Sequence, residues 1–411
     1  MTVDPTITAQ LNWLDSQQSR MEMLTERWAN INSGSYNLDG LRAMRAELSN
    51  EFQVLEGIHE VLPLSPIEQI NAEGQVVSVP MAEALSITKR PEAPIQILLV
   101  GHMDTVYGVN HSFQKVTKKE GRIINGPGVA DLKGGLVVML HALHTLENYE
   151  YKDRIGWQVL LNPDEEIGSI ASDPLLKEAA IGKNIGLVYE PALADGTLAG
   201  ARKGSGNFTI TVRGRAAHAG RNPEDGRNAI VALAELTQKI FALNGVAPGV
   251  TINPGKIEGG GALNVVPDLA ILRFNIRTQE PSNELLLLEK IQIMIEELRN
   301  RNGFSAELHG HFTRSPKPLH PRNQMLFDMV LACGAELGIP LSVKPSGGCC
   351  DGNNLWKYGL PNVDTLGVRG AHIHSSDEIM MLDSLAERAK LSALLLLKLA
   401  NGQLALPENL A

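Results

Sequence analysis

The hydrophobic positions in the first part of the chain follow two periods in turn. From Thr6 to Asn32 apolar residues recur at helical spacing, and a second helix is predicted from Asn37 to Gln53, with Asn37 as its N-cap. Short apolar runs then predict buried strands around one helix; the strands are Ile95–Val100, Trp157–Leu161 and Ile185–Tyr189, and the helix is Leu132–Leu146. Buried strands that alternate with helices are typical of a mostly parallel α/β sheet.

The pattern changes between Gly204 and Ser315, where strands alternate polar and apolar residues and therefore have one exposed face. The elements predicted there are strands at Asn207–Val212, Val250–Lys256, Leu269–Arg277 and Phe304–His311, with helices at Arg227–Leu243 and Glu284–Arg299. Their β-α-β-β-α-β order is that of a small α+β domain. After Pro316 the first pattern returns, and the elements predicted are helices at Asn323–Leu337 and Leu382–Ala400 and a strand at Asn362–Gly367.

The sequence therefore predicts an α/β domain interrupted by a second domain. We expect residues 1–203 and 316–411 to form the α/β domain, with helices on both faces of its sheet. Residues 204–315 are expected to form an inserted βαββαβ domain of ferredoxin-like α+β type. Two connections, near Arg202–Gly204 and Ser315–Pro316, favour hinge closure over a substrate.

Composition and charge narrow the class of protein. The chain has 411 residues, of which 43% are hydrophobic and 20% charged, so a disordered or fibrous chain is excluded. Its formal charge of −9 argues against nucleic acid or an anionic membrane surface as the main partner. We expect no membrane span, because no apolar run reaches the roughly 18 residues needed. With no secretory signal and only three cysteines, a cytoplasmic location is expected.

Five short segments place carboxylates and histidines just after predicted strands, where open α/β sheets bind ligands. They are Gly101–Asp104, Gly128–Gly135, Asn162–Ser169, Tyr189–Pro191 and His372–Glu378. In the first segment, His102 is able to ligate a metal through one ring nitrogen while Asp104 accepts the proton of the other. An ordinary histidine and aspartate at a strand end are the alternative.

The other segments offer further ligands. Asp131 suits a helix N-cap, but the glycines around it also let the backbone approach an ion closely. The acids Asp164–Glu166 are typical of a solvated surface, yet one carboxylate there could bind a metal while its neighbour serves as general base. Glu190 ends another strand, and His372 and His374 compete for one ligand position.

Taken together and in this order, the five segments resemble the zinc-dependent M20 metallopeptidase family. That family includes glutamate carboxypeptidases, acetylornithine deacetylase and succinyl-diaminopimelate desuccinylase. The resemblance spans nearly the whole chain and implies a zinc-exopeptidase-like mixed sheet, with the inserted domain as a lid and dimerisation domain.

The resemblance also implies two zinc ions bridged by Asp131. The remaining ligands would be His102 and Glu190 for one ion, and Glu166 and His374 for the other. Glu165 would be the general base, and Asp104 would orient His102. His374 is preferred to His372 because the family's histidine is followed by Ser or Thr and then by acids, as His374 is. Cobalt or manganese would fit the same ligands.

In the inserted domain the resemblance implies that His218 hydrogen-bonds the developing oxyanion, in many family members across a dimer. A homodimer through this domain is therefore expected. Asn264 and Arg277 match substrate-binding positions, and an arginine is able to bind a substrate carboxylate in bidentate fashion. A solvated strand-end charge is the alternative for Arg277. Arg202 and Arg314 flank the domain junctions and are further candidates for substrate binding, with a hinge salt bridge as the alternative for each.

The loop Ser346–Asn354 stands where the family carries a glycine-rich loop beside the substrate. Family members usually have a small hydroxyl residue before the aspartate of this loop, and here Cys349 and Cys350 replace it. The substitution leaves the substrate preference open. A tight turn with two small buried thiols is the other interpretation.

The reaction predicted from these segments is hydrolysis of an amide bond in a small peptide or N-acyl amino acid. The segments HMDTVYG, NPDEEIGS and YEP resemble the glutamate carboxypeptidase branch of the family more than the deacetylases. This resemblance implies a metallo-carboxypeptidase that releases a glutamate-like C-terminal amino acid. An N-acyl amino acid deacylase shares every metal residue and stays an alternative. A non-catalytic binding protein would have lost Glu165 or Asp131, and a phosphatase would surround phosphate with additional cationic or amide donors.

Overall fold

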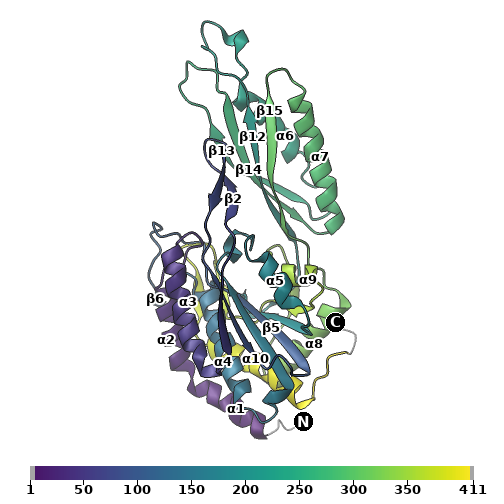
Figure 1. Cartoon of the computed structure of the whole chain (residues 1–411). Coiled ribbons are helices and arrows are strands. Elements are labelled where there is room, and N and C mark those ends of the chain that lie inside the picture. Colours follow the sequence, from purple (N-terminus) through teal and green to yellow (C-terminus); the bar gives the residue numbers. More distant parts are fainter. Residues whose placement is uncertain (1–4, 408–411) are drawn as a thin grey trace.

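The computed structural model describes residues 5–407 and has two lobes stacked end to end (Figure 1). The α/β lobe contains a six-stranded mixed sheet in the order β1-β4-β8-β5-β9-β17. Its strands are β1 (Ile58–Leu62), β4 (Ala84–Lys89), β5 (Ile95–His102), β8 (Ile155–Asn162), β9 (Ile185–Val188) and β17 (Asn362–Val363). Its helices are α1 (Pro5–Ser16), α2 (Gln18–Ala29), α3 (Leu38–Phe52), α4 (Gly134–Glu147), α5 (Asp173–Ala180), α8 (Pro321–Glu336), α9 (Asp351–Lys357) and α10 (Ser384–Asn401).

Helices cover both faces of this sheet, as predicted, because successive side chains of a strand point to opposite faces. On β5, Ile97 and Leu99 pack with α4 and α10 in the larger hydrophobic core. Leu98 and Val100, which alternate with them, pack with α5 and α9 in a smaller core. Strands β8, β5, β9 and β17 are parallel, so their carboxyl ends lie at one edge of the sheet.

One part of the predicted pattern is wrong. The first predicted helix is two helices, because the Ser16 hydroxyl donates to the Trp13 carbonyl and α1 ends there. The parallel strands continue into an antiparallel edge formed by β4 and β1, which gives the mixed sheet that the resemblance implies. Strand β1 has no fully buried side chain, so it carries little hydrophobic signal.

The stretch Val129–Glu147 is long and apolar enough to cross a membrane by length and composition. In the structure 94% of its most apolar window is buried inside the protein. It forms a short helical turn at Val129–Lys133 followed by α4, which packs against α10. The hydrophobicity of this stretch is therefore accounted for by its place in the core.

The inserted lobe contains a four-stranded antiparallel sheet in the order β13-β14-β12-β15. Its elements are β12 (Gly204–Arg213), α6 (Ala229–Phe241), β13 (Thr251–Gly259), β14 (Leu269–Thr278), α7 (Pro281–Arg299) and β15 (Ser305–Arg314). This confirms the predicted β-α-β-β-α-β order. Both helices pack on one face of the sheet, and the other face is open and mostly polar. The loops beyond Arg213 lie about 30 Å from the lobe junction, because β12 rises about 3.3 Å per residue.

A hairpin of the α/β lobe reaches the inserted lobe beside β13 and β14 (Figure 1). It consists of β2 (Ile67–Ile70) and β3 (Val76–Val79) and was not predicted. Arg213 donates to the carbonyl oxygens of Glu73 and Gly74 at its tip, and Arg273 donates to that of Ile70 at 2.7 Å. The hairpin is therefore a third connection between the lobes, in addition to the two chain crossings.

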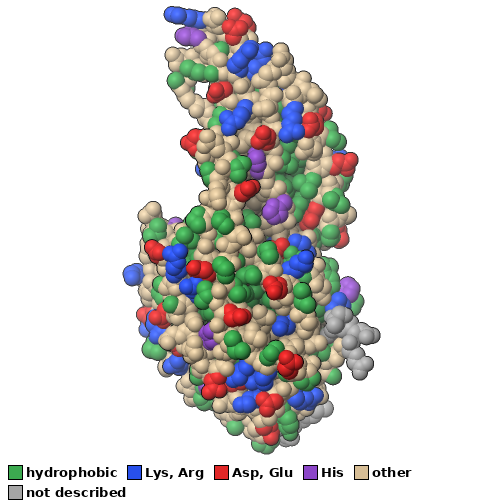
Figure 2. Space-filling view, in the orientation of Figure 1, with side chains coloured by type: hydrophobic (Ala, Val, Ile, Leu, Met, Phe, Trp, Pro, Cys, Tyr) green, Lys and Arg blue, Asp and Glu red, His purple; other side chains and the backbone are tan. Residues whose placement is uncertain are grey.

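Short strands complete the α/β lobe. They are β6 (Thr117–Lys119), β7 (Ile123–Asn125), β10 (Ala192–Leu193), β18 (Arg369–Ala371) and β19 (Ile379–Met381) in one sheet, and β11 (Leu198–Arg202) with β16 (Val343–Ser346) in another. On the face shown in Figure 2, acidic and basic side chains are interspersed over both lobes.

Glu147, at the end of α4, is a buried carboxylate that we expect to make the fold sensitive to acid. Lys89 and Arg90 contact it, and Trp157 Nε1 donates to it at 2.8 Å. Burial alone would raise the pKa of Glu147, but these three partners lower it from 4.5 to about 2. The stabilisation is complete above about pH 4.5 and is lost as the pH falls towards about 2.

We therefore expect Glu147→Gln to lower the Tm at neutral pH, with a loss of about 3 kcal/mol from the broken buried ion pairs. The difference in Tm from the parent protein should shrink in acid. Glu150→Gln, which changes an exposed carboxylate three residues away, is the control and should have little effect. A Tm difference that does not depend on pH would contradict this role of Glu147.

Candidate metal centre

Carboxylates and histidines meet at the edge where β5, β8 and β9 end. His102 is the last residue of β5, Glu165 and Glu166 follow β8, and Glu190 follows β9. Two further residues come from other elements, Asp131 from the turn before α4 and His374 from the segment between β18 and β19. The parallel strands thus gather groups that lie far apart in the sequence.

These side chains form two groups that share Asp131. In the first group, Nε2 of His102 lies 3.1 Å from Oδ1 of Asp131 and 3.8 Å from Oε1 of Glu190. In the second, Nε2 of His374 lies 3.2 Å from Oδ2 of Asp131 and 3.1 Å from Oε2 of Glu166. The potential ligand atoms of each group lie within 4.8 Å of one another. Each oxygen of Asp131 faces one group, which is the arrangement of a bridging carboxylate.

The electrostatics of the two groups fit bound cations. Oε1 of Glu190 is buried and has no hydrogen-bond partner among residues 5–407. Burial and the charge of Asp131 raise the pKa of Glu190 well above its usual value and that of Glu166 to about 8. A cation in each group would offset both effects, because it stabilises the charged carboxylates. Imidazole and carboxylate donors together suit Zn²⁺, and Co²⁺ or Mn²⁺ would fit the same donors.

Asp104 holds two parts of the site. Its Oδ1 accepts from the backbone N–H of Glu165, and its Oδ2 accepts from that of Glu166 and from the Ser35 hydroxyl at 2.7 Å. Nδ1 of His102 lies 3.4 Å from Oδ1 of Asp104 and 3.1 Å from its carbonyl oxygen. Because a carbonyl only accepts, the neutral His102 ring carries its proton on Nδ1 and leaves Nε2 free to ligate. Ser35 was not identified from the sequence.

Glu378 holds the turn that presents Asp131. Its carboxylate accepts from the backbone N–H groups of Gly128, Ala130 and Asp131 at 3.0–3.1 Å, and the Tyr107 hydroxyl donates to it at 2.9 Å. Sequence reasoning noted the acids after His374 but gave Glu378 no role. Two sequence features could have identified this contact: Glu378 follows His374 by four residues, and Tyr107 belongs to the HMDTVYG segment.

Glu165 is buried beside the two groups and is paired with Arg314. Nη2 of Arg314 donates to Oε1 of Glu165 at 2.6 Å and to the Ser169 hydroxyl at 2.9 Å, and it lies 3.4 Å from Asp351. Burial raises the pKa of Glu165, and Arg314 opposes this rise. Arg314 was a candidate for substrate binding or for a hinge salt bridge, and the structure instead places it on Glu165.

The acids Asp164–Glu166 were also interpreted as a solvated surface, and this interpretation is wrong for Asp164. It is fully buried and accepts from the backbone of Ala171 and from the backbone and hydroxyl of Ser172. Burial is the main cause that raises its pKa to about 7. Asp164 therefore organises the loop after β8, while Glu165 and Glu166 face the site.

Arg277 reaches the glycine-rich loop at the lobe junction. Its Nη1 donates to Sγ of Cys349 at 2.9 Å, and its Nε donates to Oδ1 of Asn275 at 2.9 Å. Cys350 is buried and caps α9 by accepting from the N–H of Gly352. Arg202 pairs with Asp364 at 2.8 Å, in agreement with a hinge salt bridge.

The structure does not bring His218 and Asn264 to the metal groups of the same chain. Both are exposed beyond the far end of β12, where the Ala219 N–H donates to the carbonyl of Asn264. Nδ1 of His218 accepts from the N–H groups of Gly220 and Arg221. The neutral His218 ring therefore carries its proton on Nε2, which is available as a donor. His372 is exposed and belongs to neither group of described residues.

A bridging carboxylate between two histidine–carboxylate groups, with a further carboxylate beside them, defines a metal-dependent hydrolase. Residues 200–303 match the family model of the peptidase dimerisation domain. The chain is 30% identical over 322 residues to carboxypeptidase G2 from Pseudomonas sp. (strain RS-16), covering 75% of this chain and 74% of that protein. The chain therefore belongs to the M20 family of metallopeptidases.

Two more comparisons agree with this family. Succinyl-diaminopimelate desuccinylase from Verminephrobacter eiseniae is 29% identical over 334 residues, which cover 77% of this chain and 80% of that enzyme. The structure of a tripeptidase from Staphylococcus aureus superposes with a TM-score of 0.72 at 23% identity, covering 93% of this chain and 99% of that one. This structural comparison supports the fold of the chain and not its activity.

Proposed function

We propose that this protein is a dizinc metallo-carboxypeptidase that cleaves the amide bond before a C-terminal glutamate-like amino acid. The observation that carries the proposal is Asp131, whose two oxygens face separate ligand groups while Glu165 lies beside them. The 30% identity to carboxypeptidase G2 supports the choice of a carboxypeptidase within the family.

Two zinc ions, when bound, would polarise the amide carbonyl and lower the pKa of a water towards about 7. Glu165 then takes the proton of the attacking water and passes it to the leaving nitrogen. Arg314 holds Oε1 of Glu165, which leaves Oε2 for this transfer. Asp104 holds His102 in the tautomer that ligates and fixes the turn that carries Glu165.

Arg277 binds the carboxylate of the amino acid that is released. Its guanidinium has five N–H donors, and two are engaged by Asn275 and Cys349. The remaining donors suit a carboxylate at the lobe junction, where the glycine-rich loop comes closest to the inserted lobe. Asn264 contacts the substrate from the same loop region as His218.

The protein acts as a homodimer through its inserted lobe, so that His218 completes the site of the other subunit by donating from Nε2 to the developing oxyanion. Two observations support this arrangement. His218 lies about 30 Å beyond the junction, along a ten-residue strand. Edge strand β13 and helix α6 expose large apolar side chains, namely Ile257, Ile230, Val231 and Phe241. Three free cysteines support a cytoplasmic location.

An N-acyl amino acid deacylase is the second candidate function. Its support is the 29% identity to succinyl-diaminopimelate desuccinylase over 77% of the chain. The two reactions would use the same metal ligands and the same general base, so only the substrate distinguishes them.

The test is hydrolysis of a small panel by the zinc-loaded protein, with a chelator-treated sample as control. The panel contains peptidyl and N-acyl glutamates, N-acetylornithine and N-succinyl-diaminopimelate. We expect glutamate to be released and release to stop on chelation, because the ions supply the polarisation of the carbonyl. Turnover of the other N-acyl substrates alone would assign the protein to the deacylases, and glutamate release that survives chelation would contradict the metal mechanism.

A further inference from the structure

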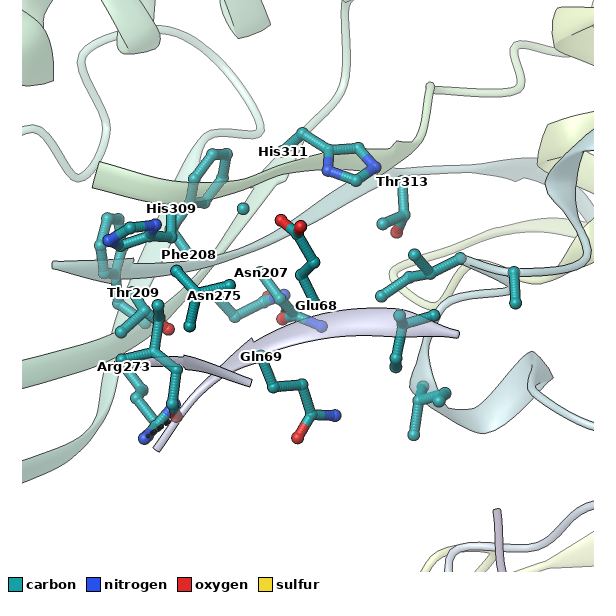
Figure 3. Close-up of a pocket in the computed structure, with 18 of the residues that line it drawn as sticks. Glu68, Gln69, Asn207, Phe208, Thr209, Arg273, Asn275, His309, His311 and Thr313 are labelled. Carbon is teal, nitrogen blue, oxygen red and sulfur yellow. Dashed lines mark hydrogen bonds between the residues drawn. The ribbon is translucent and has the colours of Figure 1, made fainter. Parts of the chain in front are cut away.

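A cleft of about 910 Å³ lies along the open face of the inserted sheet (Figure 3). Its walls are the β2–β3 hairpin, the segment after β8 from Glu166 to Pro174, and the polar face of the inserted sheet. Glu166, which belongs to the second ligand group, also lines the cleft, so the cleft adjoins the metal centre at this residue.

The register of the inserted sheet shows how this face leads away from the site. Neighbouring strands align polar side chains in rows that are two residues, or about 7 Å, apart. From the metal centre outward, the rows are Arg277–Ser205–Arg314, Asn275–Asn207–His311 and Arg273–Thr209–His309. The first row contacts Cys349 and Glu165 through its two arginines. The second row presents amide and imidazole groups to the cleft (Figure 3).

The opposite wall presents a carboxylate to these rows. Glu68 of β2 points towards the inserted sheet in Figure 3, while the neighbouring Gln69 points away and donates to the Tyr36 hydroxyl at 2.7 Å. Because Arg273 donates to the carbonyl of Ile70, Glu68 lies about two residues nearer the α/β lobe, at the level of the second row.

Glu68 is a carboxylate without a compensating charge. Within residues 5–407 no lysine, arginine or histidine lies within ion-pair distance of it. The two cations that line the outer part of the cleft, Lys256 and Arg273, are both paired with Glu258, at 2.7 and 2.8 Å. An ammonium group in the cleft would therefore find Glu68 available.

We propose that this cleft binds the acyl side of the substrate, that its occupant is a short peptidyl chain with a free amino group, and that Glu68 binds this group. The inference rests on the proposed function, because it requires the scissile bond to lie at the metal centre. Arg277 holds the released amino acid at the junction, so the acyl chain extends past Glu166.

Length and chemistry select the peptidyl chain. One row step of about 7 Å equals two residues of extended peptide, which places the amino group of a dipeptidyl acyl chain at the level of Glu68. Peptide N–H and C=O groups match the Asn207 amide and the His311 ring in the second row. The cleft volume lies near the upper end of small-molecule sites, far more than an acetyl group needs.

The test compares substrates that share glutamate as the released amino acid: N-acetylglutamate, Ala-Ala-Glu and N-acetyl-Ala-Ala-Glu. For the zinc-loaded protein we expect kcat/KM for Ala-Ala-Glu to exceed that of both acetylated compounds by about tenfold, the effect of one charge-assisted hydrogen bond. Glu68→Gln should remove this advantage and leave the acetylated substrates unchanged. Glu60→Gln, which alters an exposed carboxylate on β1 outside the cleft, should behave as the parent protein.

A binding measurement separates this inference from the proposed function. In the zinc-loaded Glu165→Gln protein, calorimetric titration with Ala-Ala-Glu should show binding that Glu68→Gln weakens about tenfold. Hydrolysis of N-acetylglutamate with no effect of Glu68→Gln on Ala-Ala-Glu would overturn the inference and leave the function standing. Glu68-dependent binding without hydrolysis of any substrate would overturn the function and support the cleft as a peptide site. Neither binding nor hydrolysis would overturn both.

Discussion

Replacement of Glu165 by Gln is expected to lower kcat by about 10³-fold or more while the protein keeps its metal, because a general base contributes 10²- to 10⁴-fold and an amide cannot take its proton. Gln preserves the volume of the side chain, and its carbonyl oxygen still accepts from Nη2 of Arg314, which also donates to the Ser169 hydroxyl. The measurements are steady-state hydrolysis of peptidyl glutamates and the metal content of the purified protein.

The matched variant is Asp131→Ala, which removes the carboxylate that faces both ligand groups. We expect it to lose bound metal and activity together, whereas Glu165→Gln loses activity alone. Loss of metal from Glu165→Gln, with retention by Glu166→Gln, would mean that the base and ligand assignments of these neighbours are reversed.

The second large effect is expected at His218. His218→Ala should lower kcat by about 10²-fold and change KM little, because one donor to a developing oxyanion acts mainly in the transition state. His218→Gln, which retains a side-chain N–H donor, should lose less. Near-normal kcat in the alanine variant would remove His218 from catalysis.

A mixed dimer tests where His218 acts. One subunit carries His218→Ala and the other carries Glu165→Gln, so the kcat of each homodimer is lowered by about 10²-fold or more. If His218 acts across the interface, one of the two sites in the mixed dimer combines an intact Glu165 with an intact His218, and activity returns. No recovery in a mixed species that is dimeric by light scattering would place His218 and Glu165 in the same chain.

The regular part of the fold was predictable because its signals are local. Residues 95–100 and 157–161 are apolar runs of strand length, and Leu269–Arg277 alternates apolar and polar residues with period two. The burial of each strand can therefore be predicted from its own residues. The β2–β3 hairpin lacks such a signal. It is stabilised by Arg213 and Arg273, which lie 140 and 203 residues away from the carbonyls they contact. Strand β1 likewise depends on β4 for its place, since its own side chains are only partly buried.

The residues of the site likewise fall into those that local sequence signals identify and those that only long-range contacts place. His102, Asp131, Glu166, Glu190 and His374 follow strands or occupy motifs whose order along the chain resembles a family, so they could be selected before any coordinates. The contact between Arg314 and Glu165 could not, because it joins the end of β15 to the loop after β8 across 149 residues. Asp164 is a further case, since a run of three acids does not reveal which one turns inward.

By itself, the sequence determined the α/β class, the inserted β-α-β-β-α-β lobe and the identity of the metal-ligand candidates, because periodicity and motif order are properties of neighbouring residues. Only the tertiary structure decided that Glu378 holds the turn of Asp131, that Arg314 pairs with Glu165 and that Glu68 faces the open sheet. These relations depend on which strand ends share an edge and which sheet face stays uncovered, and such choices are set by packing across the whole chain.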